Sequence, residues 1–358
     1  MENGRKLYAK IAEKGYDGAI FTDEVSQHWL TGFPTTDGLV LVGKDETLLI
    51  TDGRYIEAAR KQVNPDTRAE LSEGGLMETM VRKCEQAGWK KVCLDGTRIR
   101  VAAWNRIKAA LEEKGIAVED LPGVCAELRR IKTPKEIENI RTAQSITDAA
   151  FLHILTVLHK GMTEVEVAAE LEYFMRKNGA DGTAFETIAV SGPKSSLPHG
   201  VPGNVVLTEN AFLTMDYGAR YNGYCSDMTR TVVIGKADEE MKTVYGTVKE
   251  AQAAAIAALK PGVTGIAVDK GARDVIEKAG YGKAFTHSTG HSLGLEIHEA
   301  PNSSYRSETV FEPGQLQTSE PGIYLEGRFG VRIEDLLLVT EDGAEILTKS
   351  DKSLIEIA

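Results

Sequence analysis

The sequence is poor in cysteine and has no long apolar run, and each shortage excludes a class of protein. Its 358 residues include four cysteines and no CxxC pair, so we expect reduced thiols rather than a disulfide framework. No segment approaches the ~18 apolar residues of a membrane-spanning helix, and the first residues carry no apolar signal segment. We therefore predict a cytoplasmic protein that does not span a membrane.

Positive charge is also in short supply. The chain has 42 basic and 53 acidic residues, which gives a formal net charge of −11. Such a chain repels phosphate backbones and anionic lipid head groups, so the charge argues against nucleic-acid and membrane-surface partners. What is present is ordinary for a globular protein, with 42% hydrophobic and 27% charged residues.

The sequence pattern divides the chain near residue 125. Strand-like runs alternate with helical patterns over 1–125, which predicts a compact α/β domain without a glycine-rich phosphate loop. TPKE (133–136) then has the threonine, proline and glutamate of a helix N-terminus. From there helical segments alternate with strand-rich ones, so a second domain of mixed α and β structure is expected over 126–358.

An internal repeat runs through this second domain. LHKGMT (158–163) recurs 101 residues later as LKPGVT (259–264), and Gly179 and Gly280 stand at the same offset. Each copy predicts a helix that ends at glycine and a second helix that threonine caps and another glycine ends. The repeated order of helices and strands predicts a pseudo-two-fold domain, with a site in the cleft between its halves.

Two aspartates are expected on one face of a β-hairpin. Asn222 and Gly223 between two strand-like runs predict a tight turn, which pairs Asp216 with Thr229. Asp227, two residues before Thr229, then shares the face of Asp216. A solvated sheet face would also explain the pair, but the flanking residues are apolar and aromatic. They indicate burial, where carboxylates are rarely left unpaired.

Three of the seven histidines lie in one glycine-punctuated stretch, HSTGHSLGLEIHEAP (287–301). The spacing of His287 and His291 is i, i+4, but Gly290 and Gly294 argue against the helix of an HExxH zinc site. Each histidine alone would more often be a packed or surface residue. Three together in a glycine-punctuated loop favour a functional site.

Two glutamates belong to a second predicted hairpin. Between SEPGIY (319–324) and GVRIED (330–335), residues 326–328 can form a three-residue hairpin loop. The strand pairing that follows from this loop sets Glu320 opposite Glu334, whereas a two-residue loop would break the alignment. Each glutamate alone would also fit an exposed strand end.

Together these carboxylates and one imidazole have the charge to balance two divalent cations. The oxygen-rich set suits Mn²⁺, Co²⁺ or Fe²⁺. Paired ions about 3.5–4 Å apart lower the pKa of a shared water toward about 7, which gives a hydroxide nucleophile, and one ion can polarise a carbonyl. His199, in a loop of small residues before the aspartate hairpin, is placed to contact a substrate or a tetrahedral intermediate.

In chain order the motifs resemble the metallopeptidases of the pita-bread fold, most of all their Xaa-Pro branch, prolidase and aminopeptidase P. The motifs are LPHG (197–200), MDYGA and GYCSDMTRT (215–231), HSTGHSLGLEIHEAP (287–301), SEPGIY (319–324) and GVRIED (330–335). TGF (31–33) and TDGRY (51–55) are similar to the creatinase-like domain of that branch. The resemblance therefore implies an α/β (α+β) protein: a creatinase-like domain over 1–125 and a catalytic pita-bread domain with a pseudo-two-fold repeat over 126–358.

The resemblance also implies two divalent metal ions, Mn²⁺ before Co²⁺, Fe²⁺ or Zn²⁺. The implied ligands are Asp216, Asp227, His291, Glu320 and Glu334. Asp227 and Glu334 would bridge the ions, Asp216 would hold one of them, and His291 with Glu320 would hold the other.

Other matched residues would serve the substrate. The resemblance implies that His199 and His298 contact the substrate or intermediate, that Glu320 shuttles a proton and that His287 lies near the substrate pocket. Tyr324 and Arg332 would orient the ligands.

The implied reaction is hydrolysis of the bond between an N-terminal residue and a following proline, in a dipeptide or a longer peptide, through a hydroxide that bridges the metals. A methionine aminopeptidase shares the five ligands but would usually lack the front domain and the LPHG loop. A metal-free creatinase-like hydrolase or a non-catalytic binding protein would have lost ligands. The resemblance further implies a homodimer, and it does not separate dipeptidase from aminopeptidase.

Overall fold

The structure is a computed structural model that describes residues 2–358, and the chain divides into two compact units between Arg129 and Arg130. Each unit has its own sheets and its own apolar core. No helix among the described residues is both long and apolar enough to cross a membrane.

The first unit is built on one six-stranded mixed sheet with the order β4-β3-β2-β1-β5-β6. Its strands are β1 Gly18–Phe21, β2 Gly38–Gly43, β3 Thr47–Thr51, β4 Thr67–Leu71, β5 Lys91–Leu94 and β6 Ala117–Asp120. Its helices are α1 Glu2–Ala12, α2 Glu24–Thr31, α3 Ile56–Gln62, α4 Leu76–Gln86, α5 Val101–Glu112 and α6 Val124–Arg129. Buried apolar residues of α4 and α5 pack with those of the central strands, so the predicted α/β architecture is confirmed.

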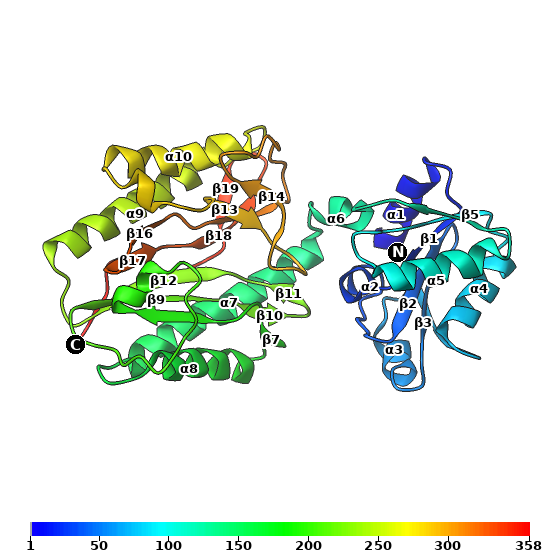
Figure 1. Cartoon of the computed structure of the whole chain (residues 1–358), viewed down its shortest axis with the longest axis horizontal. Helices are drawn as coiled ribbons and strands as arrows, with labels where there is room; N and C mark the ends of the chain where they lie inside the picture. The colour runs from blue at the N-terminus through cyan, green and yellow to red at the C-terminus, as the bar shows by residue number, and fades with distance from the viewer. Residues whose placement is uncertain (1) are drawn as a thin grey trace. The chain divides into compact units, whose positions relative to one another are not determined.

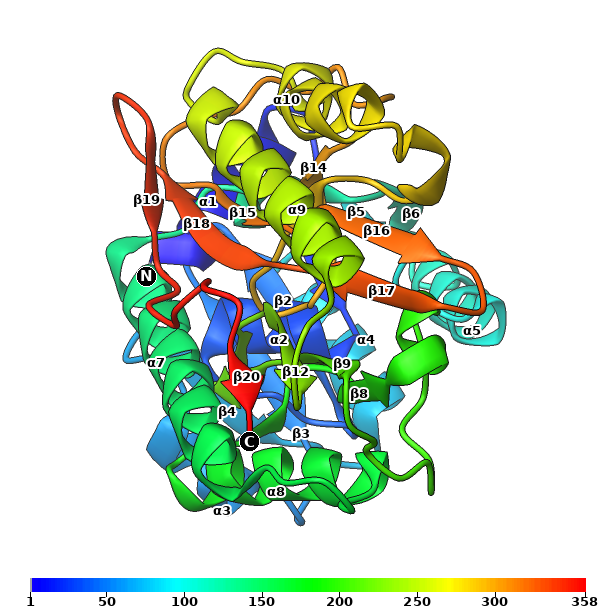
Figure 2. The same cartoon turned by 90° about the vertical axis from the view of Figure 1, so that its left-hand side faces the viewer.

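The second unit consists of two halves that each begin with a helix pair. The first half contains α7 Pro134–Val157, α8 Glu164–Lys177, β7 Gly182–Thr183, β8 Ile188–Ser191, η1 Gly192–Ser196, β9 Ala211–Tyr217, β10 Ala219–Tyr221, β11 Tyr224–Cys225 and β12 Met228–Ile234. The second contains α9 Glu239–Ala258, α10 Gly265–Lys278, η2 Gly282–Ala284, β13 Gly290–Ser292, β14 Glu299–Ser303, β15 Leu316–Ser319, β16 Gly322–Leu325, β17 Phe329–Arg332, β18 Asp335–Val339, β19 Ala344–Ile346 and β20 Glu356–Ile357. Within this unit the strands lie between α7 and α8 on one side and α9 and α10 on the other (Figures 1 and 2).

The predicted repeat is present in the structure. Helices α8 and α10 both have 14 residues, and each follows a capping threonine, Thr163 or Thr264. Each threonine also forms an isolated β-bridge, to Val206 in the first copy and to Val310 in the second. The predicted start of α7 is confirmed too, because Thr133 and Glu136 form a capping box with proline in the first turn.

The alternation of residues along β9 fixes the direction of the first aspartate. Leu213, Met215 and Tyr217 belong to the apolar cluster of α7 and α8, whereas Phe212 belongs to that of α9 and α10. Successive strand residues point to opposite faces, so Asp216 lies on the face of Phe212. This face is the one that meets the second half.

Candidate metal centre

A cavity of about 480 Å³ opens in the second unit and is lined by segments of both halves. The five ligands predicted from the sequence all line it: Asp216, Asp227, His291, Glu320 and Glu334. His199, His287, His298 and Arg332 line the same cavity, so residues spread over more than 130 positions of the sequence converge here.

The predicted hairpin register places the aspartates. Antiparallel pairing of β9 and β12 sets Asp216 opposite Thr229, as the turn at Asn222 and Gly223 predicted. Both turn residues have positive φ, 48° and 79°, as a type I′ hairpin requires. Asp227 immediately precedes β12 and is 4% exposed, so it is buried, as the apolar context predicted.

A glycine allows the strand that carries the histidine to lie against the segment that carries the first glutamate. A Cβ atom on Gly290 would lie 2.0 Å from the carbonyl oxygen of Thr318, a contact that only glycine avoids. The Thr318 hydroxyl accepts a hydrogen bond from the His291 backbone (3.0 Å) and donates one to Glu320 Oε1 (3.1 Å). Thr318 therefore fixes the backbone of His291 and the carboxylate of Glu320 relative to each other.

The imidazole of His291 faces two carboxylates through Nε2. That atom lies 3.3 Å from Glu320 Oε1 and 3.5 Å from Asp227 Oδ2. Nδ1 lies 3.1 Å from the carbonyl oxygen of Ser292, which can only accept, so Nδ1 carries the hydrogen. Burial lowers the pKa of His291. The neutral ring then presents a lone pair to two acidic groups, an arrangement that a cation between them stabilises.

The second glutamate stands at the corner between β17 and β18 and is held from β12. The Thr229 hydroxyl donates to Glu334 Oε2 at 2.8 Å, and the Glu334 backbone N–H donates to the Thr229 carbonyl at 3.1 Å. The β16–β17 hairpin has the predicted three-residue loop, with Leu325 paired with Phe329. The strand pairing of this hairpin ends at Gly322 and Arg332, two residues short of each glutamate.

The carboxylates of the centre repel one another in a buried space. Burial, reinforced by the neighbouring carboxylates, raises the pKa of Asp227 and of Glu334 well above the usual range. Burial likewise raises the pKa of Glu320 to about 7, although Arg332 opposes the change. Arg332 is the positive group on this wall, and its Nη2 lies 2.6 Å from Asp216 Oδ2.

A hydrogen-bonded chain runs along the cavity beside the acidic groups. The Tyr324 hydroxyl accepts from Arg332 Nη1 at 2.8 Å and lies 2.9 Å from His287 Nε2. Burial, followed by the charge of Arg332, lowers the pKa of His287 to about 4, so this ring is neutral and accepts the hydroxyl hydrogen. Arg332 Nη1 also donates to the carbonyl of Pro198 at 3.2 Å, which anchors the loop that carries His199.

Comparison with known proteins identifies the family. Residues 138–341 match the model of metallopeptidase family M24, and residues 5–131 match the creatinase/prolidase N-terminal domain. The chain belongs to metallopeptidase family M24.

Relatives of this M24 chain match it over nearly its whole length. It is 39% identical to the uncharacterized peptidase YqhT of Bacillus subtilis and 36% identical to the Xaa-Pro dipeptidase of Pyrococcus furiosus, with 99% of both chains covered in each case. The solved Xaa-Pro dipeptidase from Bacillus anthracis has a TM-score of 0.94 at 41% identity and 99% coverage of both chains. The X-Pro aminopeptidase from Thermotoga maritima has a TM-score of 0.91 at 36% identity, covering 97% of this chain and 100% of that one.

The donor set of this M24 peptidase fits a divalent cation. One ligand atom each from Asp227, His291 and Glu334 lie within 4.8 Å of one another. Two buried carboxylate oxygens in the cavity wall, Asp216 Oδ1 and Glu334 Oε1, have no hydrogen-bond partner in the protein. Carboxylate oxygens with one imidazole suit ions such as Mn²⁺, Fe²⁺ or Co²⁺, and such an ion would satisfy these atoms.

The sequence interpretation missed several residues that support the M24 site. In the sequence interpretation, Thr229 served only to define the strand pairing with Asp216. Its hydroxyl group, directly opposite Asp216, was a signal that this face of the hairpin is polar. Glu299, which follows His298 in the sequence, forms a buried ion pair of 3.2 Å with Lys132. Lys132 also contacts the hydroxyl of Ser292 at 3.3 Å. No local pattern links residues 167 positions apart, so this pair had no sequence signal.

Proposed function

We propose that this M24 peptidase hydrolyses the bond between an N-terminal residue and a following proline. The observation that carries the proposal is the convergence of the five acidic and imidazole groups with His199 and His298 in one cavity. The relatives named as Xaa-Pro dipeptidase and X-Pro aminopeptidase support it, because each matches 97% or more of this chain. Residues 126–358 are the proposed catalytic domain and 1–125 the proposed creatinase-like domain.

The proposed cofactor is a pair of divalent ions, with Mn²⁺ preferred. The proposed ligands are Asp216, Asp227, His291, Glu320 and Glu334. When bound, such ions activate a water as a nucleophile and polarise the scissile carbonyl.

The protein residues hold the reacting groups and move the protons. Thr318 donates to Glu320 Oε1, which leaves Oε2 to take a proton from the attacking water and to return it to the departing proline nitrogen. His298 lies beside His291, with ring centres 4.4 Å apart, and together with His199 is proposed to donate to the developing oxyanion. Arg332 keeps Asp216 in place through the 2.6 Å ion pair.

The test compares three peptides in the presence of Mn²⁺: a Xaa-Pro dipeptide, a Xaa-Pro-Xaa tripeptide and a control dipeptide with alanine in place of proline. We expect cleavage of one or both proline peptides and loss of that cleavage after chelation. The ratio of the first two rates separates dipeptidase from aminopeptidase. Activity that survives in metal-stripped protein, or an alanine peptide cleaved as fast as its proline counterpart, would contradict the proposal.

We further propose that the protein is a cytoplasmic homodimer, on the strength of the sequence resemblance and of four cysteines that form no disulfide. Light scattering coupled to gel filtration measures the assembly directly. A mass near that of one 358-residue chain would contradict the dimer without affecting the proposed reaction.

A further inference from the structure

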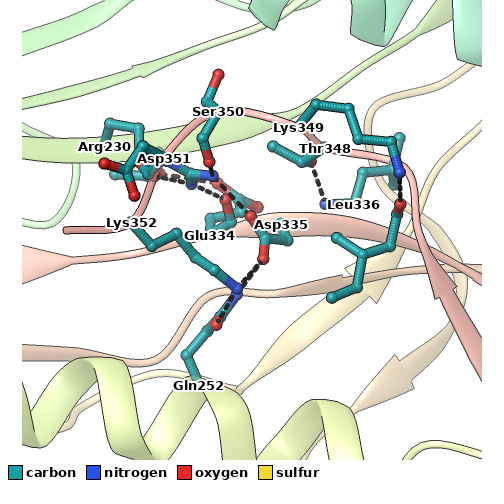
Figure 3. Close-up of polar contacts among 12 residues, drawn as sticks. Arg230, Gln252, Glu334, Asp335, Leu336, Thr348, Lys349, Ser350, Asp351 and Lys352 are labelled. Carbon is teal, nitrogen blue, oxygen red and sulfur yellow. Dashed lines mark hydrogen bonds and ion pairs between the residues drawn. The ribbon is translucent and has the colours of Figure 1, made fainter.

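Arg230, on β12, is the largest fully buried side chain among the described residues, with 1% of its surface exposed. An arginine carries five N–H donors, and here each has an acceptor between 2.5 and 3.0 Å away. One acceptor is the carbonyl oxygen of Thr229. The others are the carbonyl oxygens of Glu334, Ser350 and Asp351 and the Oδ1 atom of Asp335 (Figure 3). One guanidinium therefore joins β12, the corner between β17 and β18, and the C-terminal segment.

The partner carboxylate is held as firmly as the arginine. Asp335 Oδ2 accepts from Lys352 Nζ at 2.5 Å and from Gln252 Nε2 at 2.8 Å (Figure 3). Burial alone would raise the pKa of Asp335, but Arg230 and Lys352 hold that pKa below its usual value, so the group is a carboxylate. A buried ion pair is weak evidence for stability, because its desolvation cost offsets much of its attraction. Its place beside a proposed metal ligand suggests a different role.

That role concerns the backbone of Glu334. The residue lies outside the strand ladders, between β17 and β18. Its N–H bonds the Thr229 carbonyl at 3.1 Å, and its carbonyl accepts from Arg230 Nη1 at 2.5 Å. Both polar groups of its main chain are thus fixed from β12. These two main-chain bonds, together with the Thr229 hydroxyl that donates to Oε2, set the direction of its side chain, whose Oε1 atom has no partner.

We propose that Arg230 is a positioning residue that fixes the main chain at Glu334 and so aims this carboxylate into the metal site, supported by Asp335 and residues 350–352. The inference rests on the proposed function, since it takes Glu334 as a metal ligand. Residues 350–352 follow the segment that matches the M24 model, which ends at residue 341. Residues 350–352 therefore support the proposed metal site from outside the matched segment.

The variant Lys352→Met distinguishes the positioning of Glu334 from a simple effect of charge on Mn²⁺ binding. Its side chain is 25% exposed, so the variant removes one support of Asp335 without opening the core. Loss of a positive charge near the site would by itself strengthen cation binding. Positioning predicts the opposite, weaker Mn²⁺ binding by about tenfold, the lower end of what outer partners of metal ligands contribute. Isothermal titration of Mn²⁺ into the metal-free full-length protein measures it.

Lys349→Met is the matched control. Lys349 is exposed, its Nζ donates to the Ile346 carbonyl at 2.6 Å, and the variant loses the same charge three residues away. We expect its Mn²⁺ affinity to equal or slightly exceed that of the wild type. If Lys352→Met binds Mn²⁺ as tightly as Lys349→Met, the inference is wrong.

Arg230→Lys tests the guanidinium directly. Lysine keeps the charge but has three donors, so it cannot hold all five acceptors, and we expect Mn²⁺ affinity to fall by about 10–100-fold. Circular dichroism of the metal-free variant shows whether it folds, and if it does not, Lys352→Met decides. Wild-type affinity in a folded Arg230→Lys would overturn the inference. A wild-type protein that binds no Mn²⁺ would instead overturn the proposed function.

Discussion

At the scale of single residues, the proposed metal centre contains acidic groups that the protein alone does not neutralise. Asp227 shows this most clearly, because burial and the nearby carboxylates of Glu334 and Asp216 all raise its pKa. Thr229 satisfies one oxygen of Glu334 and Arg332 one oxygen of Asp216. The other oxygen of each of these two carboxylates, Glu334 Oε1 and Asp216 Oδ1, has no hydrogen-bond partner in the protein and is left for a ligand from outside the chain.

Asp227→Asn therefore has two expected effects of different sign. Mn²⁺ binding and Xaa-Pro hydrolysis should be lost together, because the amide brings no charge to the centre. The melting temperature of the metal-free protein should not fall, since the substitution replaces a carboxyl group whose charged form is disfavoured by burial and by the neighbouring carboxylates. Calorimetry with and without Mn²⁺ measures both effects.

Asp274→Asn is the control for this prediction. Asp274 is exposed on α10 and pairs with Lys270, and surface pairs contribute at most about 1 kcal/mol. This variant should keep full activity and full stabilisation by Mn²⁺. An Asp227→Asn protein that is still stabilised by Mn²⁺ as the wild type is would remove Asp227 from the proposed ligand set.

At the scale of elements, the sequence predicted whatever depends on local rules. The β9–β12 register followed from the turn residues Asn222 and Gly223, and α8 and α10 followed from their capping threonines and the repeat. Short strands such as β13 could not be predicted, because Gly290–Ser292 is a strand only through its pairing with β14. The roles of Arg230 and Lys132 could not be predicted either, because Glu334, which Arg230 contacts, and Glu299, which Lys132 contacts, lie more than 100 residues away in the sequence.

The contact of β13 with β15 gives a prediction at this scale. In Gly290→Ala the new methyl group would meet the Thr318 carbonyl oxygen at 2.0 Å, so β13 must move away and separate His291 from Glu320. We expect a loss of about 1–3 kcal/mol in the free energy of unfolding, as for other overpacked sites, together with weaker Mn²⁺ binding. Chemical denaturation and Mn²⁺ titration measure the two effects.

Gly246→Ala makes the same change without the contact. Gly246 lies on the exposed side of α9, and a Cβ there would have no atom within 4 Å. Alanine in a helix interior should stabilise this protein by about 0.5–1 kcal/mol and leave Mn²⁺ affinity unchanged. Equal behaviour of the two variants would show that the approach of β13 to β15 does not matter.

At the scale of the whole molecule, the residues that line the cavity, its acidic groups included, lie in the second unit. A ligand that binds only the folded form stabilises the unit that holds it. Metal is therefore expected to protect the second unit against unfolding and to leave the first unit as it was.

The cysteines report on the two units separately. Cys84, Cys93 and Cys125 are buried in the first unit and Cys225 in the second, each with 2% or less of its surface exposed. Burial raises the pKa of Cys84 and of Cys93 to about 12, so these thiols carry little reactive thiolate until they are exposed. Labelling of each cysteine near neutral pH therefore measures how often its unit opens.

We expect Mn²⁺ to slow the labelling of Cys225 but not that of the three cysteines in the first unit. At an Mn²⁺ concentration 100 times the dissociation constant, the stabilisation is about 2.7 kcal/mol, or roughly a hundredfold slower labelling through unfolding. Mass spectrometry of peptides after timed alkylation gives the four rates, and Mg²⁺ at the same concentration controls for ionic strength. If Mn²⁺ slowed all four thiols equally, the two units would unfold as one, and the metal centre would stabilise the entire chain.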